Sequence, residues 1–198
     1  MPLINGVLAS GISAHLFAPT PSFDAIATVV ANGSTSAYTF SNIPQNYTAL
    51  QIRCVARSSS ATQYDNVGIT FNTDTSTSAN YYGHQYYGGP STGALGVGGS
   101  GGTSYTTPFY GPVTSAATLP ANTYGHGVVD IYDYSLNNKF KSFKCSTGVD
   151  GTTGTGVGYY IFRSGIWNNT AAITAVNLYS QNAANWVAGT TFALYGMK

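Results

Sequence analysis

The chain has 198 residues, of which only 7% are charged, and its net charge is +1 at neutral pH. This length suits one sandwich or barrel with a substantial core and is short for two domains. The small net charge and the lack of any basic run give no electrostatic reason to expect nucleic acid as a partner. Glutamate is absent and lysine and arginine are rare, which argues against exposed helices, whereas 24 glycines and 16 tyrosines favour strands and turns.

The first part of the chain is apolar but interrupted by glycine and by Pro2, Pro19 and Pro21. It lacks the basic start and the unbroken apolar run of a secretion signal, and neither a signal nor a membrane span is predicted. We expect residues 1–22 to form an extended arm that lies on a neighbouring subunit, or alternatively a tail tucked under the chain's own domain. The candidate contact residues of the arm are Leu3, Ile4, Val7, Leu8, Leu16 and Phe17.

Short runs of alternating apolar and polar residues occupy the rest of the chain and are separated by turns rich in Asn, Gly and Ser. Residues 47–57 and 125–134 are the clearest of these predicted strands. The glycine-rich stretches 93–102 and 148–158 are predicted loops, and no segment has a helical period. Residues 23–198 are therefore expected to be one all-β domain of about ten short strands, an antiparallel sandwich or jelly roll.

The last predicted strand, residues 186–196, runs almost to the C-terminus. A strand in this place needs an earlier partner, and we expect Phe192, Leu194 and Tyr195 to lie beside the first strand around residues 26–30. The arm would then leave the domain beside the C-terminus, away from the loops that carry the variable function.

Residues that carry chemistry are few and scattered. Asp130 and Asp133 are three residues apart, which would place them on opposite faces of a strand, so the paired carboxylates of a glycosidase are not indicated. His15, His84 and His126 have no Asp or Cys at ligand spacing nearby. We therefore predict no catalytic residue, no metal and no cofactor, and we expect no enzyme; a glycan-degrading activity ranks last among the alternatives.

Two further pairs of residues have expected structural roles. Cys54 and Cys145 are too few for a disulfide scaffold and are expected to be small buried side chains, with a bridge left open if their strands are adjacent. Arg53 and Arg57 are expected to form ion pairs rather than to act in catalysis. Their candidate partners are Asp65, Asp74, Asp130 and Asp133.

A tyrosine cluster between residues 81 and 87 is the most distinctive local feature. Recognition surfaces use Tyr, Ser, Gly and Asn, because tyrosine offers a large amphipathic contact at low entropic cost. The cluster is consistent with stacking on a sugar, with packing against a neighbouring subunit, or with the general preference of tyrosine for β-surfaces. The candidate contact residues are Tyr81, Tyr82, His84, Tyr86, Tyr87 and Trp167.

Several stretches, taken in their order along the chain, resemble virion structural proteins of tailed bacteriophages, especially aquatic and cyanobacterial phages. They are residues 3–10 with 16–19, 23–29, 38–53, 130–134 with 139–142, 165–173 and 192–198. The similarity runs nearly end to end and is weakest between about residues 81 and 121. It implies a particle component that is often trimeric and whose fold is a β-sandwich of jelly-roll type.

Such domains serve as head decoration (cement) proteins and as fibre or receptor-binding parts, so the resemblance does not fix the position on the particle. The leading expectation is a capsid decoration protein that binds and stabilises the head shell through its arm and sandwich. Its partners would be the major capsid protein and copies of itself in a homotrimer, and it would reside in the virion after assembly in the host cytoplasm. The alternative is a receptor-binding module of a tail or head fibre that recognises host surface glycans. For the tyrosine cluster that expectation rests on composition alone, because the middle of the chain departs from the shared pattern.

Overall fold

The computed structural model describes residues 22–75, 80–88, 95–98, 109–151 and 158–198. These residues form twelve strands and no helix, which confirms the predicted all-β class. The strands are β1 (Phe23–Val30), β2 (Ala37–Phe40), β3 (Ala49–Ala56), β4 (Tyr64–Phe71), β5 (Tyr81–Gly88), β6 (Leu95–Gly98), β7 (Phe109–Ser115), β8 (Gly125–Tyr132), β9 (Lys141–Asp150), β10 (Gly158–Trp167), β11 (Val176–Ser180) and β12 (Thr191–Met197). Strands β5 and β6 were not predicted, since β5 is the tyrosine cluster and β6 lies in a glycine-rich stretch expected to be a loop.

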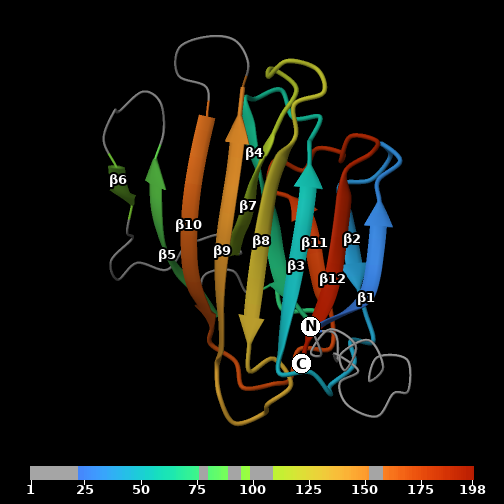
Figure 1. Cartoon of the computed structure of the whole chain (residues 1–198), viewed down its shortest axis with the longest axis vertical. Helices are drawn as coiled ribbons and strands as arrows, with labels where there is room; N and C mark the ends of the chain where they lie inside the picture. Colours follow the sequence, from blue (N-terminus) through green and yellow to red (C-terminus); the bar gives the residue numbers. More distant parts are fainter. Residues whose placement is uncertain (1–21, 76–79, 89–94, 99–108, 152–157) are drawn as a thin grey trace, which may run out of the picture.

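The twelve strands form two antiparallel sheets, which confirms the predicted sandwich. The larger sheet has eight strands in the order β1-β12-β3-β8-β9-β10-β5-β6, and the smaller has four in the order β2-β11-β4-β7. Figure 1 shows the larger sheet across the front of the molecule and the smaller sheet behind it. Because the larger sheet has twice as many strands, its outer face is the most extensive surface of the fold.

Strands far apart in the sequence pair in a nested order. Strand β1 pairs with β12, β2 with β11, β3 with β8 and β4 with β7, while β9, β10, β5 and β6 extend the larger sheet beyond β8. This nesting supports the jelly-roll topology, which stays a prediction. The expected pairing of the last strand is confirmed, because Phe192 lies opposite Val29 and Leu194 opposite Ala27.

Alternation along the strands fills the space between the sheets. In β8, Val129 and Ile131 are fully buried while their neighbours face outward. An aromatic cluster then joins the two sheets, with Phe71 of β4 lying 5.7 Å from the ring of Phe143 and 5.5 Å from that of Trp167. The core therefore spans both sheets and fixes the position of β10, where Trp167 is the last residue.

Both ends of the described domain meet at one end of the sandwich. The backbone N–H of Lys198 donates to the carbonyl of Ser22 at 3.2 Å, and the Lys198 amine pairs with Asp24 at 2.9 Å. In Figure 1 the C-terminus lies at the lower end, whereas β5 and β9 end at the upper edge of the sheet. Residues 1–21, which include every candidate arm contact, lie outside the described residues, so the arm stays a prediction.

The second predicted loop is shorter than expected. Residues 148–150 of the glycine-rich stretch belong to β9, and Gly158 is the first residue of β10, paired with Asp150. Residues 152–157 lie outside the described part of the chain. Glycine composition alone therefore did not reveal that residues 148–150 and Gly158 belong to strands.

The two cysteines are buried free thiols, as expected, and the open possibility of a bridge is not realised. Cys54 of β3 lies opposite Gly127 of β8, and Cys145 of β9 lies opposite Val129 of the same strand. Strand β8 therefore separates them. Burial raises the pKa of the Cys145 thiol to about 12 and also raises that of Cys54.

The predicted ion pairs of the two arginines are wrong. Arg53 donates to the side chain of Gln51 and covers the rings of Phe23 and Tyr195, with its guanidinium carbon 5.0 and 4.5 Å from their centroids. Arg57 is buried and donates to backbone carbonyl oxygens in residues 119–123. In a chain with so few carboxylates, the guanidinium groups find aromatic faces and carbonyl oxygens instead.

Candidate functional site: an aromatic strip on β5 and β10

Strand β5 presents alternate residues to solvent. Tyr82, His84 and Tyr86 are exposed on the outer face of the larger sheet, because successive side chains of a strand point to opposite faces. The tyrosine cluster is therefore split in two by the period of the strand. Only this half of it lies on the outer face.

Strand β10 adds two exposed aromatic side chains beside these. Phe162 lies directly opposite Tyr86, and Tyr160 lies opposite Gly88. The exposed fractions are 42% for Tyr82, 39% for Tyr86, 57% for Tyr160 and 41% for Phe162. We call these four residues the aromatic strip. Cross-strand neighbours on one face are close enough for their rings to act together.

Tyr160 has unusually open surroundings for a residue inside a sheet. Its cross-strand partners are Gly88 on β5 and Gly148 on β9, and the imidazole ring of His126 lies over Gly148, 3.3 Å from where a Cβ would stand. Its hydroxyl group lies 3.1 Å from that of Ser146. The ring is thus held at its tip, although more than half of the residue is exposed.

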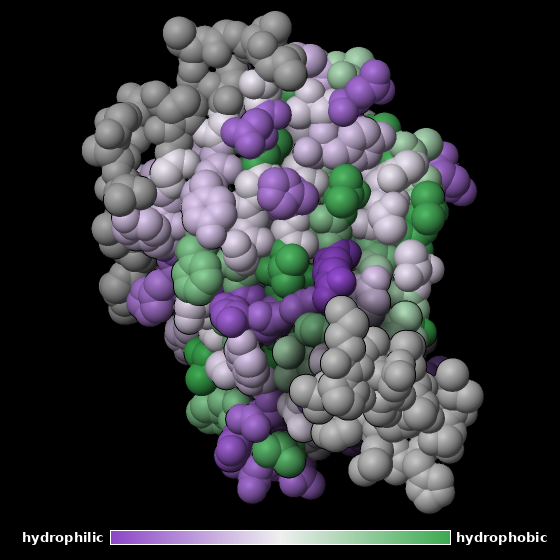
Figure 2. All heavy atoms as spheres, viewed as in Figure 1, coloured by the Kyte–Doolittle hydropathy of each residue, from purple (hydrophilic) through white to green (hydrophobic). Residues whose placement is uncertain are grey.

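Two charged residues of the same outer face, Asp130 and Lys144, are engaged with each other. Asp130 accepts a hydrogen bond from Gln51 at 2.7 Å and lies 3.4 Å from the amine of Lys144. That amine is 5.6 Å from the centroid of Tyr132, and its contacts with Tyr132 and then Asp130 raise the pKa of Lys144. Figure 2, which views this face, shows hydrophilic and hydrophobic side chains interleaved across the sheet.

Three of the six candidates from the tyrosine cluster lie on the outer face, and three do not. Tyr82, His84 and Tyr86 lie together there. Tyr87 is half-buried and packs on the inner side, against the small cluster that includes Val113 and Ile161.

The prediction that Tyr81 and Trp167 are surface contacts is wrong, because both belong to the core. Each is 1% exposed, and the hydroxyl of Tyr81 accepts a hydrogen bond from the backbone of Phe71 at 2.9 Å. The indole N–H of Trp167 donates to Asp74 at 2.7 Å. They lie opposite each other and therefore share one face of the sheet. At this end of the β5–β10 ladder, that face covers the core.

Tyr160 and Phe162 are the residues that sequence reasoning missed. The available signal was the alternation of residues 159–164, which were predicted to be a strand. Alternation could show that Tyr160 and Phe162 share a face, but not that β10 pairs with β5, which is about 75 residues earlier in the chain.

We expect replacement by phenylalanine to destabilise the protein more at Trp167 than at Trp186, although both tryptophans are buried. Trp167→Phe leaves Asp74 without the indole donor and should lower the free energy of unfolding by about 2–3 kcal/mol. Trp186→Phe should cost about 1 kcal/mol less, since its indole N–H has no hydrogen-bond partner among the described residues and both changes remove similar volume. Urea unfolding curves measure the two values, and equal losses would contradict this reading.

The groups that could support catalysis lie apart in the fold. His84 on β5 and His126 on β8 are separated by β9 and β10, and Asp133 lies in the turn after β8, 3.6 Å from Lys139. Asp65 is buried and accepts a hydrogen bond from Ser180 at 2.6 Å. Within the described ranges, no group of three or more His, Cys, Asp or Glu could hold a metal ion.

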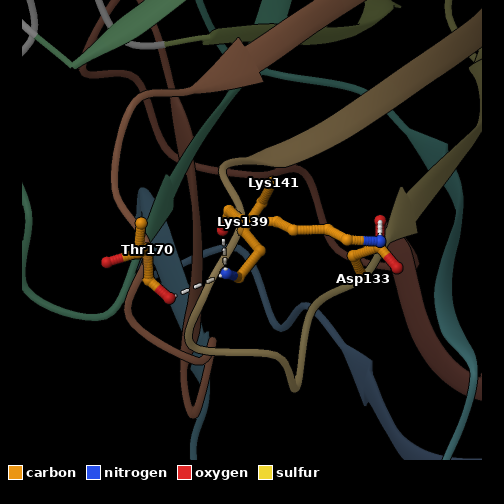
Figure 3. A network of polar contacts seen from close by, with 4 residues as sticks. All are labelled: Asp133, Lys139, Lys141 and Thr170. Carbon is orange, nitrogen blue, oxygen red and sulfur yellow. Dashed lines mark hydrogen bonds and ion pairs between the residues drawn. The ribbon is translucent and has the colours of Figure 1, made fainter.

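Lys141 is the most unusual titratable group, because its side chain is completely buried. Figure 3 shows its amine between the carbonyl oxygens of Lys139 and Thr170, at 2.6 and 2.9 Å, while the side chain of Lys139 reaches Asp133. Burial lowers the pKa of Lys141, and the nearby charge of Asp133 acts in the opposite direction. These contacts tie the turn before β9 to the segment after β10, which is a structural role.

Comparison of the chain with models of protein families, with curated proteins and with solved structures finds no match. In the part of the chain that the structure describes, no helix is long and apolar enough to cross a membrane. The aromatic strip is thus the candidate site, and a flat surface of this kind is suited to binding a partner by stacking and packing.

Proposed function

We propose that this chain is a structural protein of a tailed-phage virion that decorates the head shell. Its binding partner is the major capsid protein, which it contacts through residues 1–22 and the sandwich, and its location is the assembled particle. The proposal rests on the resemblance of the sequence to virion proteins and on the all-β sandwich, which is a compact module for covering a surface.

One observation carries the proposal, namely the fixed point at which the chain enters the sandwich. Ser22 is hydrogen-bonded to Lys198, and Asp24 is paired with the same lysine. Strand β1 is in turn held by β12 along its length. The residues before Ser22 therefore leave from an anchored position at one end, as a segment that attaches the domain to another subunit requires.

We further propose that the protein acts as a homotrimer. A chain with 7% charged residues has few charges to keep its surfaces apart in solution, and contact with copies of itself would cover part of that surface. Light scattering of the purified protein at micromolar concentration is expected to give a trimer, and a monomer would contradict this.

The decisive experiment is binding to isolated phage heads that lack the protein. The full-length chain is expected to sediment with expanded heads, whereas the chain without residues 1–21 should lose binding and keep its thermal unfolding temperature. The temperature serves as the control, because it shows that the sandwich is intact. Full binding by the truncated chain would refute the role of residues 1–21, and absence of binding by the full-length chain would refute decoration.

A further inference from the structure

The aromatic strip has the size of a ligand-binding surface rather than of a subunit interface. With 39–57% of each of the four side chains exposed, the strip offers on the order of 400 Å² of aromatic surface. A stable protein interface needs about 800 Å² from each partner. The strip alone is therefore too small to hold a second copy of the chain, but it is large enough for a few rings of a small ligand.

The charge of the surroundings indicates an uncharged ligand. Lys144 and Asp130 lie 3.4 Å apart and neutralise each other, while the exposed Asp150, two residues from the Gly148 that pairs with Tyr160, adds a negative charge that would repel an anionic ligand. The other neighbours on this face are the neutral hydroxyl groups of Ser146 and Ser164 and the imidazole rings of His84 and His126, all of which can form hydrogen bonds. A polyhydroxyl compound matches this combination of flat aromatic faces and neutral hydrogen-bonding groups.

The arrangement of the rings indicates a chain of units rather than one. Tyr86 and Phe162 are adjacent across two strands, and Tyr160 lies two residues from Phe162 along β10, roughly 7 Å away. On the β5 side, Gly88 places no side chain directly beside Tyr160, whereas the His126 ring occupies the space over Gly148 on the other side, so a ligand ring would lie against Tyr160 from the β5 side. Tyr82 continues the row on β5, so successive units of an oligomer would meet successive rings.

We propose that the outer face of β5 and β10 binds an uncharged glycan chain, whose sugar rings stack on Tyr86, Tyr160 and Phe162. This is a binding function in addition to head decoration and does not depend on where the protein sits in the particle. The exposed faces of the rings supply the contact area, and the neutral side chains around them supply hydrogen bonds to sugar hydroxyls.

The test uses the full-length protein and an array of neutral oligosaccharides, with affinity electrophoresis in gels that contain galactomannan, xyloglucan or a mixed-linkage glucan. The wild type is expected to bind at least one neutral glycan and to ignore the charged polysaccharide alginate. Phe162→Ala and Tyr86→Ala should each weaken that binding by about tenfold or more. Phe162→Tyr keeps an aromatic ring at this position and should bind the glycan about as well as the wild type.

A matched control is Phe140→Ala, because Phe140 is 48% exposed but lies in the turn before β9, outside the strip. This variant should bind as the wild type does. The proposal is overturned if no neutral glycan is bound, if only alginate is bound, or if Phe140→Ala weakens binding as much as Phe162→Ala. Concentration-dependent self-association that Phe162→Ala abolishes would assign the strip to a second copy and would also overturn it. Head binding is measured separately, so either proposal can fail alone.

Discussion

Arg57→Met is expected to lower the free energy of unfolding by about 3–4 kcal/mol. Its guanidinium donates to the carbonyl oxygens of Leu119, Pro120 and Thr123 at 2.9, 3.0 and 2.8 Å. Only 8% of the residue is exposed, so water cannot replace these bonds in the folded state. Urea unfolding monitored by tryptophan fluorescence measures the loss, which for a chain of this size corresponds to roughly 10 °C in melting temperature.

Arg53→Met is the matched control, because Arg53 lies in β3 and Arg57 directly follows that strand. Arg53 is exposed, and it contacts one side-chain oxygen and two aromatic faces, which are worth about 1 kcal/mol or less at the surface. Arg57→Lys should resemble Arg57→Met, because one amine cannot reproduce the fork of donors that meets several carbonyls. Equal losses for Arg53→Met and Arg57→Met would show that burial and the carbonyl contacts do not decide the effect.

Stability is expected to fall steeply above about pH 9, because the folded protein keeps protons that the unfolded chain releases. Burial raises the pKa of Cys145 from 9.0 to about 12 and that of Tyr179 from 10.0 to about 12. Burial also raises the pKa values of Cys54 and Tyr81. The contribution of these protonated groups to the free energy of unfolding is fully present below their pKa values in the unfolded chain. It is lost as pH rises from 9 toward 12, at up to about 1.4 kcal/mol per pH unit for each group.

Lys141 acts in the opposite direction over part of this range. Its pKa is lowered on folding, so the unfolded chain binds the extra proton and stability rises with pH until about the ordinary value of 10.5. Melting temperatures between pH 7 and 11 should nevertheless fall, since one lysine opposes several thiols and phenols. The double variant Cys54→Ala/Cys145→Ala should move the onset of the fall from about pH 9 to about pH 10. A flat profile between pH 8 and 11 would contradict the burial of these groups.

The class of fold could be predicted because each strand carries its own evidence. Alternation in residues 125–134 and the turn residues that bound them indicate a strand whatever lies beside it. The pairing of β12 with β1 was also accessible, since a strand at the end of the chain needs an earlier partner. Strand β6 was not, because Leu95–Gly98 consists of two apolar residues and two glycines and is defined by its pairing with β5.

The candidate site was predictable only in part, for a reason that the tyrosine cluster makes clear. Alternation shows that Tyr81 and Tyr82 face opposite sides of β5, but tyrosine is equally suited to a core and to a surface. Which of them is buried depends on Phe71 of β4, whose ring packs against Tyr81 and Trp167 and is itself supported by Phe143 of β9. The partners of Arg57 are likewise carbonyl oxygens, which every residue has and no sequence pattern marks.

Composition and alternation were enough to predict that this protein is built of strands, that few of its residues are charged, and that its last strand pairs with its first. These properties are local or follow from composition. Only the tertiary structure decided that Tyr160 and Phe162 stand beside Tyr86 to make one strip, and that Tyr81 and Trp167 do not belong to it. The register between β5 and β10 is set by how both strands pack on a shared core, and that packing involves residues from the whole chain.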